Sequence, residues 1–431
     1  MPLARPAFRP YSDAMTAETN IRKTDILVAG PGAAGLTAAI GLAQAGYSVV
    51  VAGEPDLRTG TRTVALFEGS LRFLGALGVR PAVEEKGEPL AVMRISDDTG
   101  SLIHLPPVEF RASEIGTEFF GYNIENSVLN ALLLERSQAL VNIVHLPSPV
   151  AAYEFGDDAV SARLADGSSI HARLVVAADG AASPARKAAG IKTQKWDYGQ
   201  TAITAFLGHD EPHNNVSSEF HTRQGPCTFV PLPPQEGAPN ASSLVWLMTH
   251  AEAERRAGLE PEALVLEIER AAHLSLGRMR LLRPINVYPI RGLMPRTVAG
   301  PRIALAGEAA HVFPPIGAQG LNLGFRDTAH LVEVLTPWEE DPGAPDVLKT
   351  YAARRAPDIA SRTMGVDMLN RVLLTKFPPI DLLRGAGIAA ISAIGPLRRR
   401  IMQEGMSPQP GAPLVMRNAA PERGRRARDH M

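Results

Sequence analysis

The clearest chemical signal in the sequence is a glycine-rich turn near the start of the chain. Gly30, Gly32 and Gly35 are spaced as G-x-G-x-x-G, and Ala33 and Ala34 lie between the last two glycines. Glycines at this spacing allow a tight turn and let backbone N–H groups at a helix N-terminus approach a pyrophosphate. The turn therefore favours a bound dinucleotide over a purely structural role.

A second candidate is a carboxylate that follows an apolar run. Residues 174–178 read LVVAA, Asp179 and Gly180 come next, and Ser183 and Arg186 follow. Aspartate before glycine is a common turn former, so Asp179 could serve the turn alone. Because it occurs together with the other motifs, we expect Asp179 to lie near the cofactor.

The third candidate stretch, residues 307–327, reads GEAAHVFPPIGAQGLNLGFRD. Its prolines fix φ and donate no N–H, whereas its glycines let other groups approach the main chain closely. A loop with both properties is typical of a place where a ligand lies against the backbone.

Apolar patterns place the first motif on an α/β unit. Residues 25–29 and 48–52 are partly β-branched apolar runs that predict buried parallel strands, and the alanine- and leucine-rich residues 36–45 predict the helix between them. The acid that binds the ribose normally ends the second strand, which here falls on Gly53. Glu54 comes one residue later, and the sequence leaves open whether it reaches the ribose.

Composition and charge exclude several classes of function. The chain has 431 residues with 45% hydrophobic and 21% charged residues and a net charge of −1, which gives no overall basic field for nucleic acid. Cys227 is the only cysteine, which excludes an internal disulfide and a cysteine-cluster metal site. We see no secretory signal and no apolar run long enough to span a bilayer, and we expect a cytoplasmic protein.

Together the three motifs resemble those of the single-component FAD-dependent aromatic hydroxylases, the group typified by para-hydroxybenzoate hydroxylase. The resemblance covers about residues 24–405, and within the group the ubiquinone-biosynthesis hydroxylases are the most similar. The supporting stretches are RTVAL at 62–66, FGYNI at 120–124, WDYGQTA at 196–202 and the HVFPPIGAQGLNLGFRD part of the third motif. Glu308 stands where the family normally has aspartate, and Asn126 lies where it often has an arginine.

The resemblance implies a set of residues around an FAD. Pro314 and Gly317 would lie on the loop at the working face of the flavin, with no clear acid–base residue. His311 is a candidate general base, but a structural role is the favoured interpretation in this family, and Asn126 could instead cap a helix. The implied cofactor-binding residues are Gly30, Gly32, Ala33, Ala34, Gly35, Glu54, Arg62, Asp179, Gly307, Glu308, Gly317, Gly320, Leu321 and Asn322. The helix that starts after Gly317 would direct its positive end at the flavin, and no metal site is expected.

The implied fold class is α/β: a Rossmann-like FAD-binding domain with an inserted, mostly antiparallel β-sheet substrate domain and C-terminal helices. The expected boundaries are 1–23 for a flexible lead, 24–195 for the first part of the FAD-binding domain (with substrate-facing strands near 89–120), 196–295 for the substrate domain, 296–345 for the second part of the FAD-binding domain, 346–405 for C-terminal helices and 406–431 for a disordered tail.

The implied activity is hydroxylation of a phenolic ring with NAD(P)H and O2 through a flavin C4a-hydroperoxide. The expected substrate is a lipophilic polyprenyl-phenol intermediate of ubiquinone biosynthesis. Two alternatives stay open: a flavin-dependent isoprenoid reductase, and a non-catalytic flavoprotein subunit of an assembly of quinone-biosynthesis proteins.

A C-terminal segment could bring the protein to the inner face of a membrane. Residues 385–397 are apolar and rich in small residues, and Arg398, Arg399 and Arg400 follow directly. One interpretation is a packed helix with a basic end. The other is a peripheral interfacial anchor, because a polyprenyl substrate would sit in a bilayer.

Overall fold

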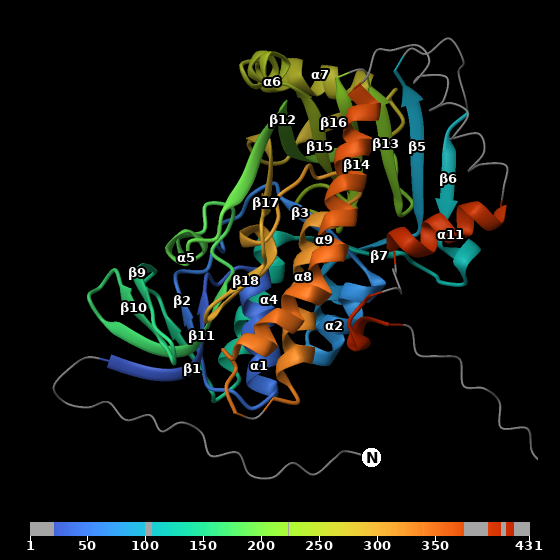
Figure 1. Cartoon of the computed structure of the whole chain (residues 1–431). Helices are drawn as coiled ribbons and strands as arrows, with labels where there is room; N and C mark the ends of the chain where they lie inside the picture. The colour runs from blue at the N-terminus through green and yellow to red at the C-terminus, as the bar shows by residue number, and fades with distance from the viewer. Residues whose placement is uncertain are drawn as a thin grey trace, which may run out of the picture.

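The computed structural model of the chain describes residues 21–99, 106–222, 224–338, 340–374, 395–406 and 411–417. Within these residues the chain forms two large sheets and one small sheet. Figure 1 shows the parallel sheet and its helices in the lower half and the second large sheet above them. This arrangement confirms the predicted α/β class with an inserted, mostly antiparallel sheet.

The lower sheet has the strand order β18-β19-β11-β1-β2-β8, and β11 also pairs with β10 of a hairpin. Its strands are β1 (Ile21–Ala29), β2 (Val49–Ala52), β8 (Ile143–Leu146), β9 (Val150–Phe155), β10 (Val160–Leu164), β11 (Ser169–Ala177), β18 (Ala299–Gly300) and β19 (Ile303–Leu305). Strands β19, β11, β1, β2 and β8 are parallel. Their apolar residues are buried, as in a sheet covered on both faces.

Strand β1 begins four residues before the strand predicted at 25–29. Residues 21–24 pair in parallel register with residues 169–172 of β11, so backbone hydrogen bonds to a neighbouring strand extend it. The expectation of a flexible lead through residue 23 is therefore wrong for residues 21–23.

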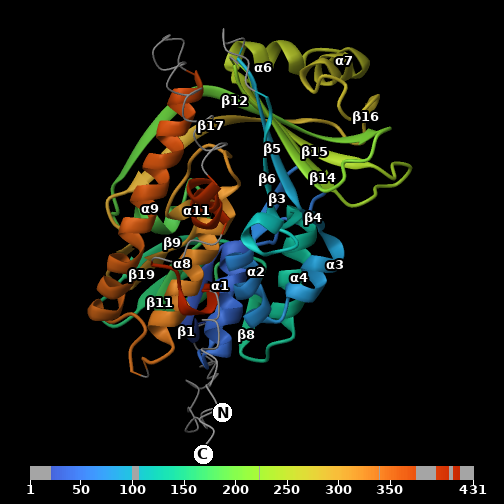
Figure 2. The same cartoon turned by 90° about the vertical axis from the view of Figure 1, so that its right-hand side faces the viewer.

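The upper sheet has the order β16-β12-β15-β14-β13-β5-β6, with β17 also paired to β12. Its strands are β5 (Val92–Asp98), β6 (Val108–Arg111), β12 (Thr193–His209), β13 (Val216–Thr222), β14 (Gly225–Leu232), β15 (Ala241–Thr249), β16 (Met279–Leu281) and β17 (Asn286–Pro295). All its pairings are antiparallel except that of β13 with β5. Helices α6 (His250–Ala257) and α7 (Pro261–Ala271) cover its outer face (Figure 2).

A small sheet and several helices complete the described structure. The small sheet has the order β3-β7-β4, formed by β3 (Thr63–Phe67), β7 (Gly121–Glu125) and β4 (Glu88–Leu90). The helices are α1 (Ala33–Gln44), α2 (Glu68–Leu77), α3 (Arg80–Lys86), α4 (Asn126–Gln138), α5 (Pro184–Ala188), α8 (Gln319–Leu335), α9 (Pro345–Leu374) and α11 (Gly395–Met406), with short 3-10 turns η1 (Ala112–Ile115), η2 (Gly307–Ala309) and η3 (Leu414–Met416). Helix α8 packs between α1 and α9.

The tail predicted to be disordered is in part ordered. Residues 411–417 pack against α2 and α8, with Ala412 and Met416 buried. The carbonyl of Gly411 accepts a hydrogen bond of 2.9 Å from His330 Nε2, and Glu333 accepts one from the backbone of Leu414. These contacts offset the conformational entropy that this segment loses when it becomes ordered.

Most of the apolar segment 385–397 lies outside the described residues. Arg398, which follows it, is held by the protein: its guanidinium forms an ion pair with Glu114 at 2.5 Å and lies over the ring of Phe110. The predicted basic cluster is therefore reduced to Arg399 and Arg400, which are exposed.

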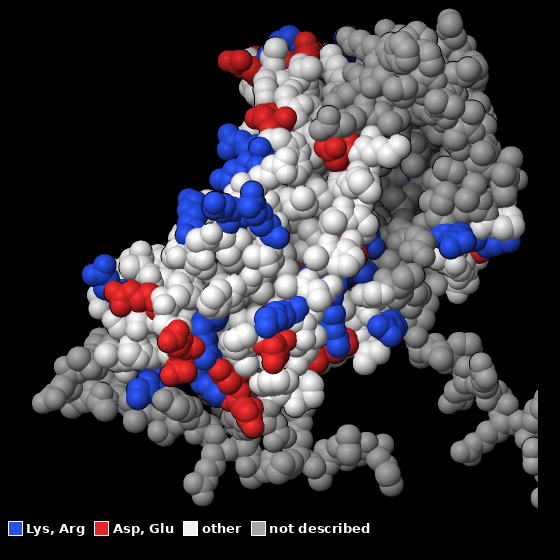
Figure 3. All heavy atoms as spheres, viewed as in Figure 1, with Lys and Arg blue, Asp and Glu red and all other residues white. Residues whose placement is uncertain are grey.

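The described residues contain no helix long and apolar enough to cross a bilayer, nor a group of three or more metal-ligating side chains. In Figure 3, acidic and basic side chains are interspersed over the lower part of the face that is shown. The charge of that part is thus mixed rather than of one sign.

Candidate active site

The three motifs meet at the carboxyl edge of the lower sheet. The backbone N–H of Gly30 donates to Ala52 O (3.1 Å), that of Ala178 to Ala29 O (2.8 Å), and that of Ala306 to Ala177 O (2.9 Å). These bonds hold the ends of β2, β1, β11 and β19 side by side. Ligands of open parallel sheets bind outside this edge, so the sheet brings the predicted binding residues together.

The glycines of the first motif fall into two kinds. A Cβ on Gly35 would lie 1.9 Å from Gly30 O, and one on Gly30, whose φ is +100°, would lie 2.5 Å from Ala178 O. Both glycines are therefore required by packing within the protein. Gly32 has an ordinary φ of −75° and no atom within 4 Å of its ideal Cβ, so its open side is available to a ligand.

The first turn of α1 presents free N–H groups at the same place. Gly32 is the N-cap of α1, no side chain caps it, and no acidic residue lies in its first turn. Ala33 is buried, and the Cβ of Ala34 would lie 2.9 Å from a Cβ on Gly307. The helix N-terminus thus has the partial positive charge and donors that a phosphate requires.

Asp179 lies half-buried directly after β11. Its Oδ2 accepts a hydrogen bond of 3.0 Å from the backbone N–H of Ala185, whereas Oδ1 is buried without a partner in the protein. Arg186, which is 1% exposed, donates to Ala309 O at 2.7 Å and so holds this motif against η2. An orphaned carboxylate oxygen at this edge is available to a ligand donor.

Glu54 is exposed and directly follows Gly53, the first residue after β2. A Cβ on Gly53 would lie 3.0 Å from Pro31 of the glycine turn, so Glu54 lies next to that turn. Its contact with a ribose stays a prediction.

The third motif forms what we call the floor of the site, residues 307–321. Glu308 is exposed and faces the cavity described below. Gly317 has a φ of +65°, and Gly320 has no atom within 4 Å of its ideal Cβ. Gly317, Gly320 and Leu321 line the cavity, whereas Pro314 is buried and Pro315 lines the cavity in its place. Pro315 thus takes the place at the cavity that was expected for Pro314, and a contact of this loop with the flavin stays a prediction.

The side chain of Asn322 is used by the protein itself, and a contact of its backbone with the cofactor stays a prediction. Its Nδ2 donates to Ala65 O (2.8 Å) and Ala318 O (2.7 Å), and its Oδ1 accepts from Phe67 N (3.1 Å) and Ser70 Oγ (2.7 Å). These bonds use the hydrogen-bonding capacity of the amide. Asn322 thus ties the floor to β3 and α2, and its side chain is not available to a cofactor.

A buried ion network supports the floor from below. Asp327 Oδ2 accepts from the backbone N–H of Gly307 (3.0 Å) and lies 2.7 Å from His311 Nε2, while its Oδ1 lies 2.7 Å from Arg355 Nε. Burial alone would raise the pKa of Asp327, but His311 and Arg355 lower it below the usual value. The side chain of His311 is 1% exposed and paired, which favours the structural role over that of a general base.

The network continues along α9 and returns to the floor. Asp358 accepts from Arg355 (2.6 Å) and Arg362 (3.0 Å), and Arg362 donates to Gln319 Oε1 (2.6 Å). Gln319 in turn donates to Gly317 O (3.0 Å). Burial opposes ionisation, but the arginines lower the pKa of Asp358 to about 2. The floor is therefore held at Gly307 and at Gly317 by one connected set of charges.

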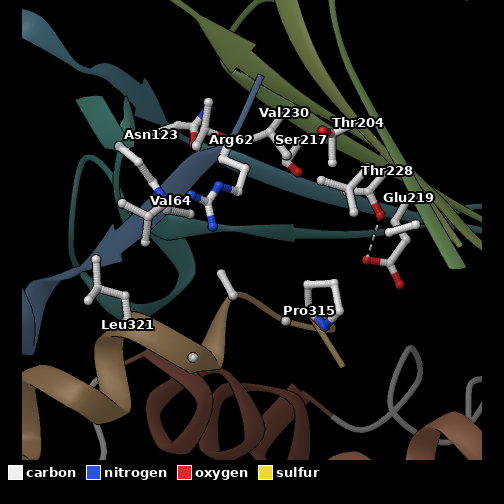
Figure 4. A pocket seen from close by; sticks show the side chains of 18 of the residues that line it. Arg62, Val64, Asn123, Thr204, Ser217, Glu219, Thr228, Val230, Pro315 and Leu321 are labelled. Atoms are coloured by element: carbon white, nitrogen blue, oxygen red, sulfur yellow. Dashed lines mark hydrogen bonds between the residues drawn. The ribbon is translucent and has the colours of Figure 1, made fainter. Parts of the chain in front are cut away.

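A cavity of about 340 Å³ lies between the floor and the upper sheet. We call the sheet side the roof; its lining residues are Ala202, Thr204, Ser217, Glu219, Thr228, Val230, Val245, Tyr288 and Ile290. They come mostly from alternate positions of strands whose other side chains pack under α6 and α7. Figure 4 shows Arg62 from the side and the labelled roof residues pointing into the space above Pro315 and Leu321.

Two polar residues line the side of the cavity next to the small sheet. The guanidinium carbon of Arg62 lies 5.8 Å from the ring centre of Tyr288. Asn126 is the first residue of α4 rather than its N-cap, and its Oδ1 is buried without a partner in the protein. The helix-capping interpretation of Asn126 is therefore wrong, because Glu125 occupies the cap position.

Sequence reasoning did not find the network of Asp327, Arg355 and Asp358, or the roof carboxylate of Glu219. Asp327 ends the third motif, about two turns into α8, and a carboxylate at this place after the glycines was a usable signal. Arg355 and Asp358 are ordinary helix residues in sequence, so only their burial identifies them.

The arrangement defines a flavoprotein class. Residues 23–364 match the FAD binding domain family, and the chain belongs to that family. The residues present fit the cofactor, because Gly32 and Gly320 leave open space, Asp179 has an orphaned oxygen and Glu308 is exposed beside them. FAD is the cofactor of this chain.

Comparison with individual relatives shows which kind of FAD-dependent protein the chain resembles. The chain is 34% identical to ubiquinone hydroxylase UbiL of Rhodospirillum rubrum (91% of this chain, 92% of the relative) and 30% identical to 3-demethoxyubiquinol 3-hydroxylase of Escherichia coli (88% and 97%). Among solved structures, p-nitrophenol 4-monooxygenase PnpA of Pseudomonas putida is similar in fold, with a TM-score of 0.74 and 19% identity over 89% of this chain and 98% of that one. The chain is an FAD-dependent monooxygenase of the aromatic hydroxylase type.

Proposed function

We propose that the protein hydroxylates the phenolic ring of a lipophilic precursor of ubiquinone, with NAD(P)H and O2 as co-substrates. The observation that carries the proposal is the position of the cavity: its floor is the loop of the third motif, and its roof combines aliphatic side chains with hydroxyl groups and one carboxylate. The relatives named as ubiquinone hydroxylases support this substrate class.

The residues would divide the work of holding FAD. The open side of Gly32 and the first turn of α1 would accept the pyrophosphate, and Asp179 and Glu308 would accept hydrogen bonds from hydroxyl groups of the cofactor. The N–H groups around Gly320 and Leu321, at the N-terminus of α8, would face the flavin ring and stabilise negative charge there. When bound, FAD supplies the reduction by NAD(P)H and the activation of O2.

The protein contributes orientation and exclusion of water rather than an acid–base triad. The roof and the floor would enclose the reacting ring between them, and the aliphatic side chains of the roof would help to keep water away from the reacting atoms. His311 is engaged with Asp327 below the floor and does not line the cavity.

The test is to measure NAD(P)H oxidation, O2 uptake and product formation together with a prenylated phenol. A hydroxylase consumes NAD(P)H and O2 in equal amounts and yields a hydroxylated ring. An isoprenoid reductase would oxidise NAD(P)H without O2 uptake and reduce a side-chain double bond. A non-catalytic subunit would do neither, and either of these outcomes overturns the proposal.

We further propose peripheral membrane contact through α11. Arg399 and Arg400 are exposed there, and each basic residue near an anionic surface contributes about 1 kcal/mol. Arg399→Gln with Arg400→Gln should therefore reduce binding to anionic vesicles at low salt, whereas identical sedimentation of both proteins at every ionic strength would contradict the contact.

A further inference from the structure

The roof carries one carboxylate among otherwise neutral side chains. Glu219 on β13 lies directly opposite Thr228 on β14, and both residues line the cavity. Thr228 Oγ1 donates to Glu219 Oε2 at 3.3 Å, a bond drawn in Figure 4, where both side chains point into the cavity above Pro315. The Glu219 side chain is 19% exposed.

His221 holds the other oxygen of this carboxylate. Its Nε2 lies 2.5 Å from Glu219 Oε1, and its side chain is 9% exposed. Burial alone would raise the pKa of Glu219, but the hydrogen bond from His221 lowers it below the usual value. The carboxylate is therefore held ionised at the cavity surface, and its oxygens still have lone pairs available after the two protein bonds.

Three other ionisable side chains line the cavity: Arg62, Tyr288 and Glu308. Tyr288 shares the roof with Glu219, and its hydroxyl can both donate and accept a hydrogen bond. Glu308 belongs to the floor, and Arg62 enters from the side next to the small sheet. Thr228 and His221 each pair with one oxygen of the Glu219 carboxylate, and a ligand donor can use a remaining lone pair on the cavity side. Glu219 is thus the carboxylate that lies opposite the floor.

We propose that Glu219 accepts a hydrogen bond from the phenolic hydroxyl of the substrate, and that His221 positions the carboxylate for it. This inference rests on the proposed function and names the group that the roof recognises. A charged acceptor orients the ring by its hydroxyl group. It also increases the electron density of the phenolic oxygen and therefore of the ring carbons, which favours hydroxylation of the ring. The same charge disfavours substrates that carry a carboxylate of their own.

Binding measurements in the absence of NAD(P)H test the inference without turnover. The oxidised, FAD-loaded protein is titrated with a 2-alkylphenol and with its methyl ether, and binding is followed by the flavin absorbance change. Wild type should bind the phenol about 10-fold more tightly or better, because a hydrogen bond to a charged group is lost in the ether. Absence of this preference in wild type overturns the inference.

Variants assign the preference to one carboxylate. Glu219→Gln should reduce the phenol-to-ether ratio to within about 3-fold of unity, and His221→Gln, which can still donate to Glu219, should keep most of it. Glu254→Gln, which removes an exposed carboxylate on α6, is the matched control and should leave the ratio unchanged. A wild-type ratio that survives in Glu219→Gln overturns the inference.

Failure of this inference is distinguishable from failure of the proposed function. If wild type hydroxylates the phenol with NAD(P)H and O2 but shows the same ratio as Glu219→Gln, only the role of Glu219 is wrong. If wild type binds the phenol with no hydroxylation, the proposed function is wrong whatever the ratio.

Discussion

The floor and the roof of the cavity are built in different ways. The floor presents backbone groups and glycines, and a buried ion network holds it through Gly307 and Gly317. The roof presents alternate side chains of several strands, most of them aliphatic or hydroxylic. A cofactor shared by a whole class requires fixed backbone geometry, whereas substrate recognition requires side chains that can be exchanged singly. The difference indicates that the floor tolerates little change and the roof tolerates more.

The largest effect should come from breaking the network below the floor. Asp327→Ala removes one of the two carboxylates that pair with Arg355, whose side chain is fully buried, and the carboxylate that pairs with His311. Loss of one partner of a buried ion pair costs about 3–5 kcal/mol, so we expect the free energy of unfolding in urea to fall by that amount. Asp346→Ala, on an exposed carboxylate of α9, is the control and should cost less than about 1 kcal/mol. Equal losses would show that the network does not support the floor.

The two kinds of glycine should respond oppositely. Gly35→Ala places a methyl group against Gly30 O and should lower the free energy of unfolding by about 3 kcal/mol. A Cβ at Gly32 meets no protein atom within 4 Å, so we expect the Gly32→Val apoprotein to keep its stability but to lose FAD, because the side chain fills the space of the pyrophosphate. Flavin occupancy and urea unfolding measure both properties. Full occupancy in Gly32→Val would show that this turn is not the phosphate site.

The carboxylate of Glu308 should contribute one hydrogen bond from the floor to FAD. Its removal in Glu308→Ala should weaken FAD binding about 10- to 150-fold, since a hydrogen bond to a charged group contributes about 1.5–3 kcal/mol. Glu308→Asp should bind FAD at least as well as wild type, because the family normally has aspartate there. Fluorescence titration of apoprotein with FAD measures all three, and equal affinities would mean that the glycines alone hold the flavin.

The far end of α8 should respond to pH. Burial lowers the pKa of His330 from 6.5 to about 4, so the unfolded chain binds a proton that the folded chain rejects between these values. The free energy of unfolding is therefore not reduced by His330 above pH 6.5, and it falls as the pH drops from 6.5 towards 4. His330→Gln, which can still donate to Gly411 O, should flatten the stability profile in this window. An unchanged slope in urea unfolding would contradict the assignment.

The smallest effect should come from the roof. Val230→Ala removes apolar contact at the cavity and should cost about 1–2 kcal/mol in unfolding. Because Val230 lies on the roof, the affinity for FAD should stay the same while the affinity for a 2-alkylphenol falls. A loss of FAD affinity similar to that of Glu308→Ala would remove the distinction between roof and floor.

The same difference explains how much could be predicted from the sequence. Gly30, Gly32, Asp179 and Gly307 lie within three residues of strand ends, and parallel strands bring their carboxyl ends to one edge, so short motifs were enough. The roof uses single residues from strands far apart in the chain, and Glu219 has no local signature. Within the third motif, the hydrogen bonds that the side chain of Asn322 makes to β3 and α2 have no local signature either.

Isotope labelling tests the central claim most directly. FAD-loaded wild type is supplied with NAD(P)H, a prenylated phenol and O2 enriched in the heavy isotope of oxygen, and the product is analysed by mass spectrometry. The account predicts one labelled oxygen on the ring of the product and none in the side chain. A ring hydroxyl that carries oxygen from water, or consumption of NAD(P)H and O2 with hydrogen peroxide as the sole oxygen product, would contradict it.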